Sequence, residues 1–167
     1  FVKTRASVKG WQGFVGDQVI ASLEIEGGAL FSFGDDTRIT ERFFLGSDSF
    51  RGFAVDGIGP RDLDTDDALG GNFFGVARAQ VSFPLGLPEE LGIFGGAFVD
   101  AGTLWGLDRT TFGDTVIDDD PKLRVAAGGL LFIDSPFGPV ELSAAVPLVD
   151  EDGDEDEVFR FSVGTRF

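Results

Sequence analysis

The 167-residue sequence contains no cysteine and no histidine. The chain can therefore form neither a disulfide framework nor a thiolate or imidazole zinc site, and histidine-based acid–base catalysis is excluded. Basic residues are scarce, because 13 Lys and Arg stand against 29 Asp and Glu, for a net charge of −16. This balance excludes a nucleic-acid-binding protein that relies on a basic face. We expect no catalytic residues, no metal, no cofactor and no nucleic-acid partner.

Long apolar runs are also missing. No segment approaches the roughly 20 apolar residues of a membrane-spanning helix, because Glu, Asp, Gly or Arg interrupts every candidate. Methionine is absent and the first residues have no charged and apolar leader pattern, so we expect a mature or excised piece of a protein. Hydrophobic residues nevertheless make up 43% of the chain, with 19 Phe and 25 Gly, which excludes a disordered acidic tail.

Apolar residues recur with a period of two. From Val19 to Phe33 the odd positions are apolar or glycine, whereas Ser22, Glu24 and Glu26 occupy even positions. This run is far longer than the typical strand of about 5–6 residues, and such long strands indicate the wall of a β-barrel. A soluble β-sandwich would have shorter strands and more even turns. The sequence predicts strands near 1–11, 18–33, 72–83, 91–105, 122–134, 139–149 and 157–167.

The predicted connections alternate between short and long. Short links at 12–17, 84–90 and 135–139 are separated by long or medium connections at 34–71, 106–121 and 150–156. Transmembrane barrels have this pattern, with short periplasmic turns and longer external loops. We therefore predict an all-β, antiparallel transmembrane β-barrel in the outer membrane, with its C-terminus on the periplasmic side. Trp11 and Trp105 are candidate residues for the membrane interface.

A bacterial single-chain barrel has an even number of strands, at least eight, whereas the sequence predicts only seven here. Either the 34–71 segment hides a further strand, or residues 1–167 are the C-terminal portion of a larger barrel. We favour the second interpretation, because an open sheet in lipid would leave backbone groups unpaired.

The connection from Gly34 to Gly71 is too long for an ordinary loop. It contains Phe43, Phe44, Phe50 and Phe53, which a loop that merely met water would not need. We therefore predict that it folds back into the barrel lumen and buries these aromatic side chains.

The centre of this connection carries the motif Phe50-Arg51-Gly52-Phe53. The segments that accompany it are Glu41-Arg42-Phe43-Phe44-Leu45-Gly46, Ile58-Gly59-Pro60-Arg61, Asp100-Ala-Gly-Thr-Leu-Trp105, Ser135-Pro-Phe-Gly-Pro139 and the closing strand that ends in Phe167. Together they resemble the BamA family of outer-membrane assembly factors, whose barrel carries an R-G-F loop. The resemblance runs from about residue 34 to the end of the chain.

The resemblance implies a sixteen-stranded barrel, of which this chain would supply the last seven strands or so. It also makes Arg51 the tip of the lumenal loop, held by acidic side chains on neighbouring strands. Asp100 matches one such position, and Gln80 stands where relatives often carry Glu. A guanidinium held by one carboxylate together with amide and carbonyl acceptors is chemically reasonable.

The closing strand resembles the terminal recognition signal of outer-membrane proteins, with Phe159, Phe161 and Phe167 as its aromatic residues. The family resemblance implies a non-enzymatic core component of the assembly machinery, which inserts barrel proteins through a lateral seam and by strand templating. The implied partners are unfolded clients, companion lipoproteins, outer-membrane lipids and lipopolysaccharide.

Two alternatives remain open: a related two-partner secretion or translocation pore, and a small outer-membrane enzyme or passive channel. The acidic run 150–157 lacks the spacing of an EF-hand, so we predict a solvated loop there.

Overall fold

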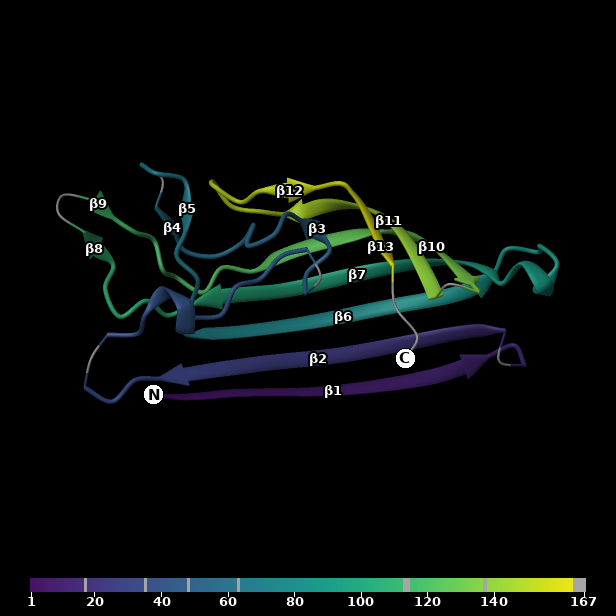
Figure 1. Ribbon diagram of the computed structural model, residues 1–167, viewed down its shortest axis with the longest axis horizontal. Helices are drawn as coiled ribbons and strands as arrows, with labels where there is room; N and C mark the ends of the chain where they lie inside the picture. Colours follow the sequence, from purple (N-terminus) through teal and green to yellow (C-terminus); the bar gives the residue numbers. More distant parts are fainter. Residues whose placement is uncertain are drawn as a thin grey trace.

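The computed structural model describes residues 1–16, 18–34, 36–47, 49–62, 64–112, 115–136 and 138–163. Within these residues, one antiparallel sheet of seven strands dominates the fold, and its strands lie in the order of the sequence (Figure 1). The strands are β1 (Val2–Phe14), β2 (Val19–Phe31), β6 (Phe73–Pro84), β7 (Ile93–Trp105), β10 (Arg124–Ser135), β11 (Gly138–Val149) and β13 (Phe159–Val163).

The predicted all-β, antiparallel architecture is confirmed, and the seven predicted strands are all found. At the described ends their limits move by at most three residues, as in β1, which continues to Phe14. The predicted last strand is described from Phe159 to Val163, and Phe167 lies outside the described residues. The two helical segments are single 3-10 turns, η1 (Ile39–Glu41) and η2 (Glu89–Leu91), and no described helix could span a membrane.

The period of two separates the sheet into two chemically different faces. Glu24, Arg78 and Asp100 are successive cross-strand partners on one face, which we call the loop face because the 34–71 segment packs on it. The opposite, apolar face carries large exposed side chains on β1, β2, β6, β7, β11 and β13. They include Val8, Leu23, Ile25, Val81, Val99, Leu142, Val146, Phe159 and Phe161.

Trp105 lies on the apolar face and stacks on Phe73, with 5.8 Å between ring centroids. Trp11, the other candidate for the membrane interface, lies on the loop face, opposite Ser22. There its indole contacts the Lys9 ammonium, 5.6 Å from the ring centroid. Apolar and polar residues alternate only weakly in β1, so the sequence does not indicate which face Trp11 occupies.

The connections are sorted by length to opposite ends of the sheet (Figure 1). The short turns follow β1, β6 and β10, and the long connections follow β2 and β7. The long connections and the segment between β11 and β13 contain two-residue strands that pair with one another: β3 (Gly52–Phe53) with β12 (Asp156–Glu157), β4 (Arg61–Asp62) with β5 (Asp67–Ala68), and β8 (Thr111–Phe112) with β9 (Thr115–Val116). None of these joins the main sheet, so the described part of 34–71 adds no strand to it.

The main core lies between the 34–71 segment and the loop face. Phe50 and Phe53 are fully buried, Phe43 is 7% exposed, and Phe44 is half-buried. The Phe43 ring packs on Phe74, with 4.7 Å between centroids. The other members of this core are Leu30, Leu45, Ile58, Val76, Leu104 and Ala126. Burial of these apolar side chains holds the segment against the sheet.

Candidate functional site

Arg51 reaches from the long connection to the loop face. Its Nε donates to Asp100 Oδ2 at 2.8 Å and its Nη2 to Asp100 Oδ1 at 2.7 Å, which is a bidentate pair. Its Nη1 donates to Gln80 Oε1 at 2.7 Å. Asp100 is fully buried and the Arg51 side chain is 13% exposed. All these donors are directed at acceptors on two neighbouring strands.

The rest of the site fixes the plane of the guanidinium. Its central carbon lies 3.6 Å from the centroid of the Phe98 ring, on the same strand as Asp100. The backbone N–H of Arg51 also donates to Asp100 Oδ2, at 3.2 Å. Asp100 therefore accepts hydrogen bonds from both the backbone and the side chain of Arg51. These bonds hold the local direction of the loop backbone as well as the guanidinium.

The sequence around Arg51 explains how the loop reaches this position. Phe50 and Phe53 anchor the chain on either side of Arg51, with their rings 5.3 Å apart in an edge-to-face arrangement. Gly52 adopts a φ of +93°, which favours glycine, and a Cβ there would lie 2.7 Å from the Ala126 Cβ. The glycine thus allows close approach of the loop backbone to β10.

The structure therefore brings together the predicted residues Phe50, Arg51, Gly52, Phe53, Asp100 and Gln80. It places Phe159 and Phe161 elsewhere, on the apolar face, where they are 79% and 63% exposed. In the desolvated pair, loss of one partner leaves an uncompensated charge and costs about 3–5 kcal/mol.

A second arginine that the sequence analysis missed holds the loop next to this pair. Arg78 on β6 donates from Nε to the Ser49 carbonyl oxygen at 2.8 Å. Its Nη1 and Nη2 donate to Glu24 Oε1 at 3.0 Å and Glu26 Oε2 at 2.8 Å. The available signal was its position two residues before Gln80, and therefore on the same face.

The carboxylates of β2 continue this charged row toward β1. Arg5 donates to Glu26, and Lys9 lies 3.3 Å from Glu24 Oε2. Opposite charges therefore alternate across three strands beside Arg51. This row gives the loop face a polar character that the apolar face lacks.

Asp108 and Asp119 anchor the connection that follows β7. Asp108 accepts hydrogen bonds from the backbone N–H of Thr37 at 2.6 Å, from the Thr37 hydroxyl, and from Asn72 Nδ2 at 3.1 Å. Burial acts to raise the pKa of Asp108, but these hydrogen bonds prevail and lower it. For Asp119 burial prevails, and its pKa is raised although the Leu107 and Gly106 N–H groups donate to it.

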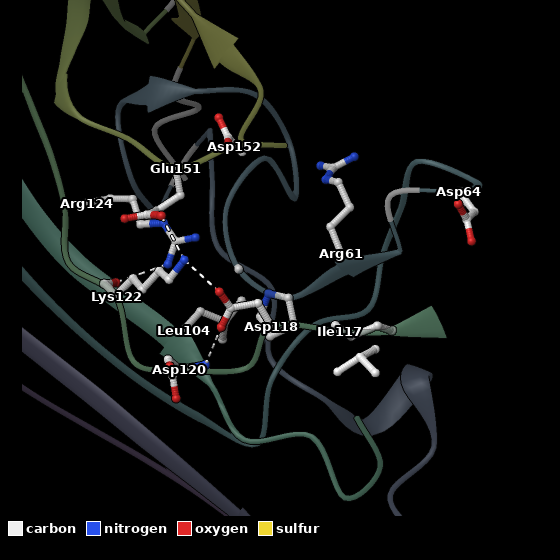
Figure 2. A pocket seen from close by; sticks show the side chains of 13 residues that line it. Arg61, Asp64, Leu104, Ile117, Asp118, Asp120, Lys122, Arg124, Glu151 and Asp152 are labelled. Carbon is white, nitrogen blue, oxygen red and sulfur yellow. Dashed lines mark hydrogen bonds and ion pairs between the residues drawn. The ribbon is translucent and has the colours of Figure 1, made fainter. Parts of the chain in front are cut away.

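The long connections also enclose a hollow of about 450 Å³ (Figure 2). Part of its charged lining is internally paired, because Lys122 Nζ lies 2.7 Å from Asp118 Oδ2 and 2.9 Å from Glu151 Oε2. Hydrogen bonds to these two carboxylates raise the pKa of Lys122. Among the described residues, no group of three or more carboxylates is arranged to hold a metal ion. The Arg51 cluster remains the better candidate site.

Comparisons with known proteins give a consistent result. The Omp85 superfamily domain matches residues 1–167. The chain is 36% identical over 168 residues to the outer membrane protein assembly factor BamA of Neorickettsia risticii (strain Illinois), covering 100% of this chain and 22% of that protein. It is 29% identical over 151 residues to the same-named protein of Neisseria meningitidis serogroup B, covering 76% of this chain and 19% of that protein.

The fold has a counterpart among solved structures. The crystal structure of BamA from Haemophilus ducreyi lacking POTRA domains 1–3 matches with a TM-score of 0.82 and 26% identity, covering 98% of this chain and 34% of that one. The chain spans about a fifth of the length of the two BamA proteins named above, 22% of one and 19% of the other.

Proposed function

Because this chain belongs to the Omp85 superfamily, we propose that it forms the C-terminal part of an outer-membrane barrel that folds and inserts other β-barrel proteins. The observation that carries the proposal is the docked loop, in which Arg51 is bound by Asp100 and Gln80 on the loop face. A loop that fills the interior would obstruct an open channel, which favours this function over a passive channel. The relatives named above are assembly factors, which supports the same function.

The apolar face is suited to contact lipid, because its exposed residues include Leu23, Ile25 and Val146 along the strands. The loop face then lines the lumen, with the charged row of Arg78, Glu24 and Glu26 inside. Because transmembrane barrels have longer external loops, we place the long connections outside, so that β13 runs toward the periplasmic side.

We assign insertion to a lateral seam next to β13. In the described part of the chain, β13 pairs with β11 and ends the sheet, so its other edge is available to a client strand. Backbone groups in lipid must be paired, so a client strand gains free energy by adding to such an edge. The proposed partners are unfolded clients, companion lipoproteins, lipids and lipopolysaccharide. The mechanism uses no nucleotide, metal or cofactor.

The test uses the complete protein with its companion lipoproteins in proteoliposomes and follows folding of an unfolded client barrel. The wild type should accelerate folding, and Arg51→Ala should lose most of the acceleration. Arg109→Ala is the matched control, because Arg109 is 71% exposed and pairs with the half-exposed Asp36.

The absence of acceleration by the wild type would contradict an insertion function. Passage of the client across the vesicle membrane, without insertion, would instead support the secretion pore.

A further inference from the structure

We propose that Arg51 is a positioning residue for the closing strand β13. By docking on Asp100, it fixes the short strand β3, and β3 in turn holds the segment that leads into β13. This inference deepens the proposed function, because it couples the lumenal loop to the strand at the proposed seam. Four sets of contacts carry it.

The first set is a continuous run of backbone hydrogen bonds. Strand β3 pairs with β12 in antiparallel register, with Gly52 opposite Glu157 and Phe53 opposite Asp156. The pairing continues through Ala54 N–H to the Glu155 carbonyl at 2.8 Å and Glu155 N–H to the Gly57 carbonyl at 2.9 Å. The residues directly after Arg51 therefore pair through their backbone with the residues directly before β13 (Figure 1).

The second set is steric and leaves the two segments little room to slide. A Cβ on Gly57 would lie 2.7 Å from the Glu155 carbonyl oxygen. On the other side, a Cβ on Gly52 would lie 2.7 Å from Ala126 Cβ and 3.3 Å from Ala145 Cβ. The loop backbone is thus wedged between residues 155–157 and strands β10 and β11. A movement of β3 away from the sheet must break the pairing with β12 or carry β12 along.

The third set consists of side chains that cross between the two segments. Arg160 on β13 donates from Nη1 to the Ser47 hydroxyl oxygen at 2.6 Å. Arg61 donates from Nη1 to Glu155 Oε1 at 2.7 Å. These bonds lie on either side of the β3–β12 pair in sequence, and they join the loop to the closing strand at one further point and to the segment before it at another.

The fourth observation is that the described part of β13 pairs with only a short part of its neighbouring strand. In the described residues, its register with β11 covers Val140–Ala144 alone, whereas β10 pairs with nearly all of β11. The segment before it has another anchor, a buried pair in which Arg124 Nε and Nη2 donate to Asp154 at 3.0 and 3.2 Å. Between Asp154 and β13, the loop supplies the contacts named above, and β11 adds one hydrogen bond, from the Ala145 N–H to the Val158 carbonyl oxygen at 2.8 Å. Release of Arg51 should therefore loosen the start of the closing strand.

Hydrogen–deuterium exchange of the complete protein in lipid, without any client, tests this coupling. Arg51→Ala should raise exchange by roughly tenfold or more in peptides from 49–57 and also from 154–163, because both segments open together. Arg51→Lys, which keeps the charge but not the bidentate fork, should fall between the wild type and Arg51→Ala. Exchange in β2 should stay unchanged, which a general loss of stability would not allow.

Gly57→Ala supplies the complementary variant, because it wedges the loop away from Glu155 without touching Arg51 or Asp100. It should raise exchange in 154–163 and leave Arg51 docked, with little change at 49–52. Faster exchange at 49–57 with wild-type exchange at 154–163 in Arg51→Ala would overturn the proposal, and so would wild-type exchange at 154–163 in Gly57→Ala. Since no client is present, these results do not depend on whether the protein inserts clients.

Discussion

Arg51 is held by a combination of one carboxylate, one amide oxygen and one aromatic ring, and the amide is the unusual member. Gln80 Oε1 accepts the third guanidinium hydrogen bond at 2.7 Å, where a carboxylate would also fit by geometry. The ionised guanidinium already makes this hydrogen bond charge-assisted, and a carboxylate in place of the amide would add an opposite charge to it. A single substitution at position 80 can therefore test how strongly this third hydrogen bond holds Arg51.

Gln80→Glu should strengthen the clamp, because the Arg51 guanidinium would then face two carboxylates. We expect a gain of about 1 kcal/mol in the free energy of unfolding, measured by urea titration of the folded protein in vesicles. Ser82→Ala is a control for loss of the weak Gln80 Nε2 hydrogen bond at 3.3 Å to the Ser82 hydroxyl. A destabilised Gln80→Glu variant would show that the amide is required.

Asp108 should make the loop anchorage sensitive to acid. Its pKa is lowered below the ordinary value of 3.8, so its carboxylate contributes stability above that pH and loses it as the pH falls through the lowered pKa. The difference in thermal stability between the wild type and Asp108→Asn should therefore be greatest near neutral pH and shrink below about pH 4. A difference that is independent of pH would show that the charge of Asp108 is irrelevant.

At the scale of elements, the sequence predicted the strands well because the two faces of a barrel wall differ so strongly. The alternation of apolar residues with Glu24, Arg78 and Asp100 sets the phase, and glycines at turns mark the ends. The contacts of Arg78 and Arg160 with the loop could not be predicted. They join an irregular segment to strands far along the chain, and no periodic pattern records such pairs.

Gly28 on β2 offers a test of how tightly the loop packs on the sheet. A Cβ there would lie 2.4 Å from Phe74 Cε1 and 2.8 Å from Phe43 Cζ, and both rings are buried. Gly28→Ala should cost about 1–3 kcal/mol, the typical penalty of overpacking.

Gly75 on the apolar face is the matched control, since a Cβ there has no neighbour within 4 Å. Gly75→Ala should leave the unfolding midpoint nearly unchanged. Equal effects of the two substitutions would contradict the packing of Phe43 over Gly28.

At the scale of the whole molecule, the family resemblance predicted from the R-G-F motif is confirmed by the match of the Omp85 superfamily domain and by the similarity to BamA. The motif was informative because its residues have separate roles. Arg51 binds Asp100, Gly52 allows the loop backbone to approach β10, and the two phenylalanines are buried in the core. The excess of Asp and Glu over Lys and Arg, by contrast, did not indicate a functional site. Many of these carboxylates lie in the long connections, where Asp118 and Glu151 pair with Lys122.

The apolar face should tolerate no charge if it contacts lipid. Ile25→Arg, at a position 56% exposed on this face, should destabilise the folded protein in vesicles by up to about 4 kcal/mol, the cost of Arg at the bilayer midplane. Ser22→Arg on the loop face is the control and should have a small effect. The fraction folded is read from heat-modifiable migration on gels, and equal effects would contradict a lipid-facing surface.

The central claim is that the function depends on Arg51 bound to Asp100, and a double-mutant cycle of client folding rates tests it most directly. The rates are measured in proteoliposomes for the wild type, Arg51→Ala, Asp100→Ala and the double variant. If the two residues act as a pair, each single variant loses most of the acceleration and the double variant is no slower than either. Independent, additive losses, or single variants as fast as the wild type, would contradict the account.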